Sequence, residues 1–189
     1  MIYIGIDSSL SCTAVGVIKR DGKGEAALVS YTKIPSSPDM EYVDRCLHII
    51  EKLKEAIDPY FKNNSRTKIV TDREIFIGIE TPNSFRGGDV TRKLCGLYGI
   101  ILYFIKVAYD INAVEINTKH AKKVTTGKGN AQKDRIVASI NKLFGLKLVF
   151  SKTKSKTDDD VADALSIAYC MLVEDSIRNK TTKKKRRKR

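Results

Sequence analysis

Residues 2–7 read IYIGID, a short apolar run that includes Gly5 and ends on an acid, Asp7. A run of this length followed by the turn-forming residues SSLS predicts a buried strand. Residues 75–80 read IFIGIE and end in the same way, on Glu80. If the two strands are neighbours in one sheet, both acids emerge at the same edge, where open α/β sheets place their functional sites.

The strand at residues 2–7 opens a series of three apolar runs. The other two are CTAVGVI at residues 12–18 and AALVSYTKI at residues 26–34, and turn-rich segments separate the three. Short strands that follow one another so closely pair antiparallel in most proteins. The sequence therefore predicts an antiparallel three-strand meander at the start of the chain.

The rest of the chain alternates helical and strand patterns. Val43, Leu47, Ile50 and Leu53 recur at helical spacing and predict the inner face of a helix that Pro59 ends. The later elements are a strand at residues 75–80, an apolar helix at 90–110, a strand at 111–116, a short helix and basic loop within 117–130, a helix ending at Gly145, and a last helix beginning near 158. This order predicts a mixed α/β sheet flanked by helices, with crossover connections after the meander.

Positive charge is concentrated at the end of the chain. The formal net charge is +13, and the last ten residues, KTTKKKRRKR, hold eight Lys or Arg, which leaves 13 − 8 = +5 on the remainder. A run of like charges repels itself and buries little apolar area, so we expect one folded domain at residues 1–177 and a disordered basic tail at 178–189. Such a tail suits non-specific contact with phosphates, or a solubilising or localising role.

Cysteine usage and hydropathy indicate the compartment. The four cysteines form no CxxC pair and no Cys/His pair at metal-ligand spacing, so we expect small buried thiols in a reducing environment. The longest apolar stretch, LCGLYGIILYFIKVAY, contains Lys106 and is too short for a membrane span. Met1 is followed at once by the first strand, without a signal peptide. We expect a cytoplasmic protein with no membrane partner.

Two further acids, Asp160 and Asp163, lie three residues apart in the last predicted helix and therefore share one face of it. With Asp7 and Glu80 they would make four converging carboxylates, whose mutual repulsion a divalent cation relieves. Oxygen ligands without His or Cys favour Mg²⁺, or Mn²⁺ in its place, over Zn²⁺. Four acids can hold two such ions, the arrangement that hydrolyses phosphodiesters.

Each acid also has a structural interpretation. Asp7 can begin an Asx turn, and Glu80 can be a solvated strand end. Asp158, Asp159 and Asp160 lie where a helix N-cap and first turn favour acids. Asp163 is harder to explain structurally, because its neighbours in VADALSIA are small or apolar and suited to packing. The combination of the four carries more weight than any one acid.

Four segments, IGIDSSLSCTAVGVI, IGIET, KKVTTGKGNAQKD and DDVADALSIA, resemble in order and spacing the RuvC family of Holliday junction resolvases. The resemblance covers about residues 2–173. It implies an RNase H-like fold and a homodimeric, Mg²⁺-dependent endonuclease that nicks opposing strands of a four-way DNA junction symmetrically. It also implies that Asp7, Glu80, Asp160 and Asp163 are the catalytic acids.

The resemblance also implies roles for residues outside the acids. Lys122 and Lys133 fall on basic positions that the family uses near the scissile phosphate and the DNA backbone. Lys128, in the segment TTGKGN, would add a charge beside exposed backbone N–H groups. Phe85 is the nearest candidate for the aromatic side chain that the family stacks on an unpaired base, and Arg86 beside it is a candidate DNA contact. Gly96 and Gly99 in the apolar helix 90–110 allow close approach of a second copy, or of other core elements.

Other functions fit parts of the same pattern. The same fold can serve a nuclease for RNA–DNA hybrids, flaps or other branched DNA, because surfaces outside the metal site select the substrate. The segment IGIDSS also resembles the first phosphate-binding hairpin of actin-like nucleotide binders, although these need two lobes and glycine-rich adenosine contacts. A non-catalytic DNA-binding protein on the same scaffold is a third interpretation, against which the four intact acids argue.

Overall fold

The sheet has five strands in the order β3-β2-β1-β4-β5. The computed structural model describes residues 1–21, 24–62, 75–82, 88–153 and 157–186. β1 (Ile2–Asp7), β2 (Cys12–Arg20) and β3 (Ala26–Pro35) form the predicted antiparallel meander. β4 (Ile75–Glu80) pairs parallel with β1, and β5 (Val114–Ile116) pairs parallel with β4. The mixed sheet confirms the predicted fold class.

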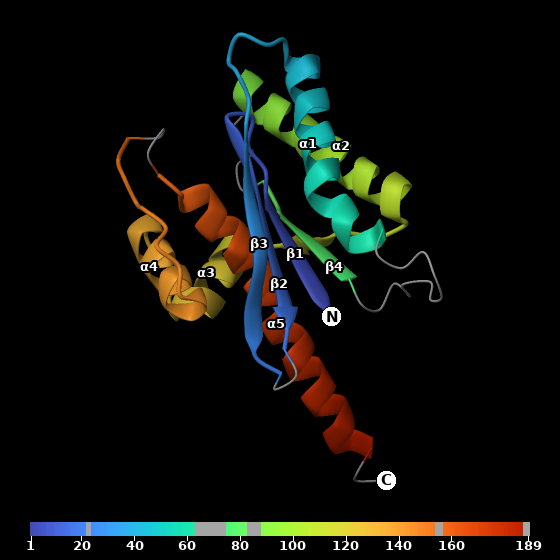
Figure 1. Cartoon of the computed structure of the whole chain (residues 1–189), viewed down its shortest axis with the longest axis vertical. Helices are drawn as coiled ribbons and strands as arrows, with labels where there is room; N and C mark the ends of the chain where they lie inside the picture. The colour runs from blue at the N-terminus through green and yellow to red at the C-terminus, as the bar shows by residue number, and fades with distance from the viewer. Residues whose placement is uncertain (22–23, 63–74, 83–87, 154–156, 187–189) are drawn as a thin grey trace.

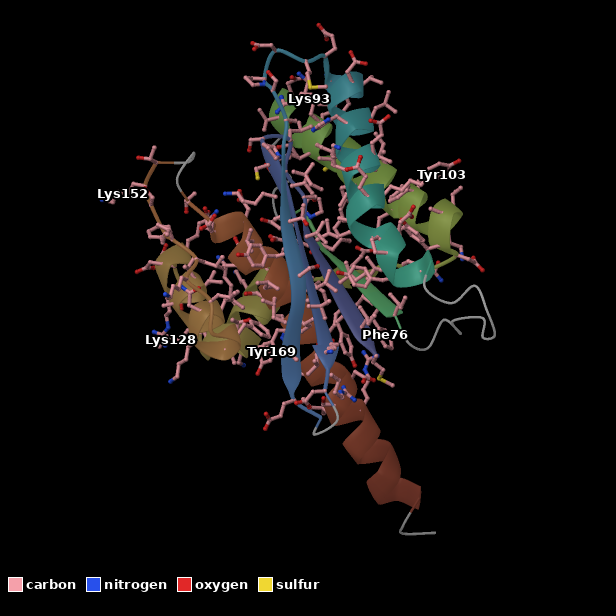
Figure 2. The ribbon with its side chains drawn as sticks, viewed as in Figure 1. Phe76, Lys93, Tyr103, Lys128, Lys152 and Tyr169 are labelled. Carbon is pink, nitrogen blue, oxygen red and sulfur yellow. The ribbon has the colours of Figure 1, made fainter. Side chains whose placement is uncertain are left out.

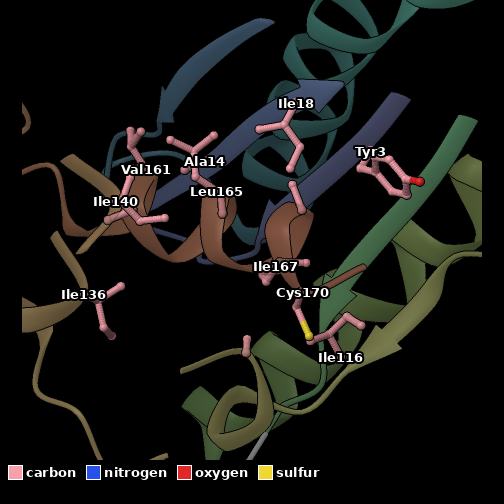
Figure 3. Close-up of a cluster of buried hydrophobic side chains, with 14 of the residues drawn as sticks. Tyr3, Ala14, Ile18, Ile116, Ile136, Ile140, Val161, Leu165, Ile167 and Cys170 are labelled. Atoms are coloured by element: carbon pink, nitrogen blue, oxygen red, sulfur yellow. The ribbon is translucent and has the colours of Figure 1, made fainter. Parts of the chain in front are cut away.

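Helices cover both faces of this sheet (Figure 1). α1 (Tyr42–Lys62) and α2 (Asp89–Tyr109) pack on one face, against side chains such as Ile4 and Val15. The opposite face, which includes Tyr3, packs against α3 (Thr118–Thr126), α4 (Lys133–Phe144) and α5 (Asp159–Arg186). Figure 3 shows the apolar cluster on this second face, where side chains of α5 meet those of β1 and β2. Successive residues of β1 therefore serve two separate cores.

Glycines in adjacent strands let α5 approach the sheet closely. Gly5 of β1 is paired with Gly16 of β2 on one side and Gly78 of β4 on the other. A Cβ atom at Gly5 would lie 2.1 Å from the carbonyl oxygen of Ala164, and one at Gly16 would lie 2.8 Å from the backbone nitrogen of Leu165. The row of glycines thus forms a shallow channel in which the backbone of α5 rests directly on the backbone of the sheet.

The buried face of α1 agrees only in part with the one that the sequence predicted. Val43 and Leu47, which we expected in the core, are 63% and 57% exposed. Leu53, from the same predicted set, is fully buried, so the prediction is wrong only for the two residues of the first turns. Their face of the helix continues to Glu51 and Lys54, whereas the buried face stays apolar along its length. The side chains that point to the core are Cys46, Ile49, Leu53 and Ile57.

Of the two helix ends that the sequence predicted at Pro59 and Gly145, tertiary contacts change the first. α1 continues beyond Pro59 to Lys62, rather than ending at the proline. Tyr60 Oη lies 2.7 Å from the Ser30 hydroxyl, and the ring of Phe61 stacks on Tyr109 with centroids 4.3 Å apart. These contacts hold the last turn although proline cannot donate a backbone hydrogen bond. α4 ends as predicted, with its C-cap Gly145 at a φ of 65°.

α5 continues through the predicted boundary at residue 178. Its backbone is helical from Asp159 to Arg186, so the segment that we expected to be disordered is helical as far as Arg186. Lys and Arg have high helix propensity, and positive charge is favourable near a helix C-terminus. The buried first half of α5 also supplies the nucleus onto which later turns can add. Figure 1 shows α5 running past the edge of the sheet toward the C-terminus.

α2 carries more apolar surface than its contacts with the sheet bury. Leu97, Ile101 and Ile105 are buried, whereas Tyr103 and Val107 are 70% and 65% exposed. Figure 2 shows Tyr103 pointing away from the sheet.

Among the helices in the described part of the chain, none combines the length and apolarity needed to cross a bilayer.

Candidate active site

Parallel pairing of β1 and β4 places the two strand-end acids side by side. Ile6 is paired with Ile79, and Asp7 and Glu80 are the next residues on each strand. Both side chains line the same open cavity of about 1140 Å³. The hydroxyl of Thr118, the first residue of α3, donates a hydrogen bond to Oε1 of Glu80. The predicted meeting of these two acids at one sheet edge is confirmed.

The N-terminal turns of α5 bring the other two acids to this edge. Asp160 and Asp163 line the same cavity as Asp7 and Glu80. Burial, followed by the charges of Asp163, Glu80 and Asp160, raises the pKa of Asp7 well above its usual value. The geometry therefore brings all four predicted acids together, from two strands and one helix.

The cavity is electrostatically unfavourable for so many carboxylates. Burial raises the pKa of Asp163 to about 7, although the nearby Lys133 acts in the opposite direction. Burial and the charge of Asp159 also raise the pKa of Asp160. Carboxyl groups whose pKa values are raised together in this way retain protons or need compensating positive charge.

Lys133 supplies one positive charge and is held by an acid in the first turn of α5, Asp159. Its ammonium donates a hydrogen bond to Oδ2 of Asp159 and lies 3.9 Å from Oδ2 of Asp163. Burial by itself raises the pKa of Asp159, but the hydrogen bond and the charge of Lys133, together with other hydrogen bonds, lower it below its usual value. Asp159 is thus a residue of the cavity. Its place in the first turn of α5 resembled an ordinary helix start, and no signal in the sequence distinguished it.

Asp158 has the structural role, at the start of the last helix, that the sequence allows for each acid in this run. Its carboxylate pairs with Lys33 at 3.3 Å and accepts the backbone N–H of Val149 at 3.0 Å. Its carbonyl oxygen accepts the N–H of Ala162, as an N-cap residue does. The three consecutive acids therefore divide into a cap, a partner of Lys133 and a member of the acid cluster.

The other residues that the sequence predicted to contact DNA do not all lie in the cavity. Lys122, on α3, lines the cavity with the acids. Lys128 is exposed in the turn between α3 and α4 (Figure 2). It is not among the residues that line the cavity. Its backbone N–H donates to the Thr126 hydroxyl at 3.2 Å. Phe85 and Arg86 lie outside the described residues.

The donor set matches a hard divalent cation. Asp7, Glu80, Asp160 and Asp163 offer carboxylate oxygens, which Mg²⁺ prefers. One further oxygen is available, because Oδ1 of Asp159 is buried and has no hydrogen-bond partner among the described residues. A buried carboxylate oxygen without a donor is costly, and a nearby cation relieves that cost. The residues present therefore fit divalent metal ions.

Comparison with known proteins identifies relatives over almost the whole chain. The family model described as crossover junction endodeoxyribonuclease RuvC matches residues 3–171. The RuvC protein of Carboxydothermus hydrogenoformans is 31% identical over 170 residues, which cover 89% of this chain and 94% of the relative. The RuvC protein of Rickettsia bellii is 30% identical over 173 residues, covering 92% and 98% of the two chains.

Solved structures support the same fold. RuvC of Thermus thermophilus superposes with a TM-score of 0.67 at 22% identity, covering 90% of this chain and 92% of that one. The same protein in complex with a Holliday junction substrate gives a TM-score of 0.69 at 20% identity, with the same coverage. Together, the family match over residues 3–171, the relatives and the acid-lined cavity show that this chain belongs to the RuvC family of crossover junction endodeoxyribonucleases.

Proposed function

We propose that this chain is a structure-selective DNA endonuclease that resolves four-way junctions by symmetric paired nicks. The observation that carries the proposal is the convergence of Asp7, Glu80, Asp160 and Asp163 in one cavity beside Lys133. The cavity is open and lies at the end of the sheet, so a nucleic-acid backbone can reach it without rearrangement of the core. Family membership supports the four-way junction as the substrate.

We infer that these four acids hold two Mg²⁺ ions, for which Mn²⁺ can substitute. Bound in this way, the ions would neutralise the carboxylates, activate a water molecule and stabilise the leaving oxygen. The raised pKa values of Asp7 and Asp163 support a site that is built for added positive charge. Thr118 has a supporting role, since its hydroxyl fixes one oxygen of Glu80 and thereby orients the other.

The lysines act on the substrate in this proposal. Lys133, anchored by Asp159, would stabilise the charge that develops on the scissile phosphate. Lys122, on the α3 side of the cavity, would hold the adjacent DNA backbone. Lys128 would contact a phosphate farther from the cleaved bond, and Arg86 and Phe85 would contact DNA near the branch point. Phosphate contacts of this kind position the nucleic acid without reading its sequence.

We further propose that the active unit is a homodimer, because a four-way junction presents two equivalent strands for cleavage. The apolar surface on the α1 and α2 layer supports this proposal. Tyr103 and Val107 of α2 are strongly exposed, and so are Val43 and Leu47 of α1. A second copy could cover this surface, and isologous pairing would place two active sites in a symmetric arrangement.

The dimer can be tested at the helix surface. Tyr103→Glu and Val107→Glu place charges on exposed positions and spare the core, so the folded monomer should persist. Light scattering coupled to gel filtration should show a dimer for the wild type and a monomer for the double variant. A wild-type protein that is monomeric at micromolar concentration would contradict the proposal.

We propose that this activity takes place in the cytoplasm of a bacterial cell, or of a cell infected by a phage. All four cysteines are free in the structure, which suits a reducing compartment.

The decisive experiment measures cleavage of labelled four-way junctions, matched duplexes, flaps and RNA–DNA hybrids, with Mg²⁺ or with a chelator. Asp7→Asn should reduce junction cleavage by about 10³-fold or more, while junction binding changes little. Asp39→Asn, at an exposed acid outside the cavity, serves as the matched control. Paired nicks that need both metal and Asp7 are the expected result. Preferential cleavage of hybrids or flaps would reassign the substrate, and binding without any nicks would refute catalysis.

A further inference from the structure

A second group of metal-binding side chains lies between α3 and α5, apart from the residues that line the active-site cavity. It consists of His120 on α3 and of Cys170 and Glu174 on α5. Nε2 of His120 lies 2.8 Å from Oε1 of Glu174. Ligand atoms from the three residues all lie within 4.8 Å of one another. Cys170 and Glu174 are four residues apart, so both project from the same face of α5 toward α3.

These donors differ in chemistry from those of the active site. An imidazole nitrogen, a thiolate sulfur and a carboxylate oxygen together suit Zn²⁺, whereas Mg²⁺ selects oxygen donors. Zinc bonds of about 2.0–2.3 Å in a tetrahedral arrangement separate ligand atoms by roughly 3.3–3.8 Å. Rotamer adjustments of about 1 Å would therefore bring donors within 4.8 Å of one another to bonding distance. Three protein ligands leave a fourth position for water, as in many zinc sites.

The three side chains differ in their exposure to solvent. The Cys170 side chain is fully buried (Figure 3), while His120 and Glu174 reach the surface and leave an access route for an ion. Binding of a metal ion would take the Cys170 sulfur as a thiolate ligand and release its proton to solvent.

We propose that His120, Cys170 and Glu174 form a Zn²⁺ site that clips α3 to α5. Both helices carry parts of the active site: Thr118 and Lys122 lie on α3, and the acids Asp160 and Asp163 lie on α5. A metal bond between the helices would restrict their relative motion and raise the stability of the fold. This inference goes beyond the proposed nuclease function, since the clip could exist whether or not the chain cleaves junctions.

Cobalt is the probe for this site, because a Co²⁺–thiolate bond gives a sulfur-to-metal charge-transfer absorption in the near ultraviolet. The metal-stripped, reduced full-length chain is titrated with Co²⁺ in the presence of excess Mg²⁺, which saturates the oxygen sites. We expect the charge-transfer band to appear at one equivalent, and Zn²⁺ to displace it. Cys170→Ala should abolish the band. Cys12→Ala is the matched control, because Cys12 lines the active-site cavity and is the thiol that could bind Co²⁺ there.

A second variant keeps the test valid if Cys170→Ala disturbs the core. His120 is exposed, so His120→Asn should fold normally and weaken Co²⁺ binding by at least about tenfold, the smallest loss seen even for outer-shell partners. Zn²⁺ should raise the melting temperature of the wild type more than that of either variant. Absence of a thiolate band, loss of the band in Cys12→Ala rather than Cys170→Ala, or an equal thermal shift in all proteins would refute the site. Junction cleavage is measured separately, so its failure would be distinguishable from this result.

Discussion

Lys133 and Asp159 form an ion pair that joins the start of α4 to the start of α5, directly beside Asp163. The Asp159 side chain is 9% exposed, against 49% for Lys133, so the acid is the fixed partner. Asp159→Asn keeps the shape and removes the charge that holds the ammonium. We expect a fall of about tenfold in the single-turnover cleavage rate with little change in junction affinity, because the lysine is then positioned less well.

Asp158→Asn is the control for this variant, because Asp158 pairs with Lys33 instead. A double-mutant cycle tests whether Asp159 acts through the lysine. In a Lys133→Met background, Asp159→Asn should have almost no further effect on cleavage. Additive losses would show that Asp159 acts independently of Lys133.

Thr118 should affect metal binding through Glu80. Thr118→Val removes the hydroxyl that donates to Oε1 of Glu80 and preserves the side-chain volume. The Mg²⁺ concentration needed for half-maximal cleavage should rise by roughly tenfold, as expected when a ligand loses its outer hydrogen bond. Thr81→Val removes a nearby hydroxyl that donates to the Ile116 carbonyl at 3.3 Å, and it should leave the Mg²⁺ requirement unchanged. Equal shifts in the two variants would contradict the role of Thr118.

The stability of the metal-free protein should depend on the pKa of Asp163. This pKa is about 7 in the folded chain, above the ordinary value of 3.8. The folded state therefore binds more protons than the unfolded state between these values, and the free energy of unfolding falls as pH rises from about 4 to 7. Asp163→Asn removes this contribution and should stabilise the metal-free protein at about pH 8 by a few kcal/mol at most.

Urea unfolding at about pH 5 and about pH 8 in a chelator measures this difference. The pKa of Asp7 is also raised, so part of the decline in the free energy of unfolding with pH should remain in Asp163→Asn. Mg²⁺ added at the higher pH should stabilise the wild type more than the variant, since the ion compensates the same charges. An Asp163→Asn variant that is less stable than the wild type at the higher pH without metal would contradict the assignment.

The close contact between α5 and the sheet predicts a severe effect of a small substitution. Gly5→Ala would place a methyl group 2.1 Å from the Ala164 carbonyl oxygen, which belongs to the backbone and cannot rotate away. We expect a loss of about 3 kcal/mol in the free energy of unfolding. Gly99→Ala is the control, because no atom lies within 4 Å of the added Cβ, and it should stabilise α2 by up to about 1 kcal/mol. Similar effects of the two substitutions on denaturant midpoints would argue against the close contact.

Deletion of residues 180–189 should lower non-specific affinity for DNA. This segment holds eight Lys or Arg. For every phosphate that the shortened chain no longer neutralises, the slope of log affinity against log salt concentration should become shallower by about 0.9. Binding to duplex and junction should weaken together at low salt, while the preference for junction cleavage is retained. Loss of that preference would make the segment part of the recognition surface.

The sequence predicted those parts of the site that depend on strand ends and helix periodicity. Asp7 and Glu80 were recognisable because each ends an apolar strand, and Asp160 and Asp163 because their spacing places them on one helix face. The spacing of the apolar runs also predicts the meander and the mixed sheet, whereas the strand order β3-β2-β1-β4-β5 comes from the structure.

Features that depend on tertiary contacts were not predictable. Asp159 has the composition of a helix start, and its role appears only because α4 brings Lys133 beside it. For α1, Leu53 is buried as predicted, but Val43 and Leu47 face outward, because contacts with the sheet orient the helix by its longer apolar face. The helix beyond residue 178 is not apparent from the sequence, because its like charges repel one another although Lys and Arg have high helix propensity.

The unbroken α5 helix sets the distance between the acid cluster and the C-terminal end of that helix. Between Asp160, in the acid cluster, and Arg186 the helix advances 26 residues, or about 39 Å at 1.5 Å per residue. On B-form DNA, with about 3.4 Å per base pair, this distance corresponds to roughly 11 base pairs, close to one turn of the double helix. The helical backbone thus places Arg186 about 39 Å along α5 from the acid cluster. In the proposed nuclease, a duplex arm that reaches this end must extend about one helical turn from the cut, so arms shorter than that should lose the added affinity abruptly rather than gradually.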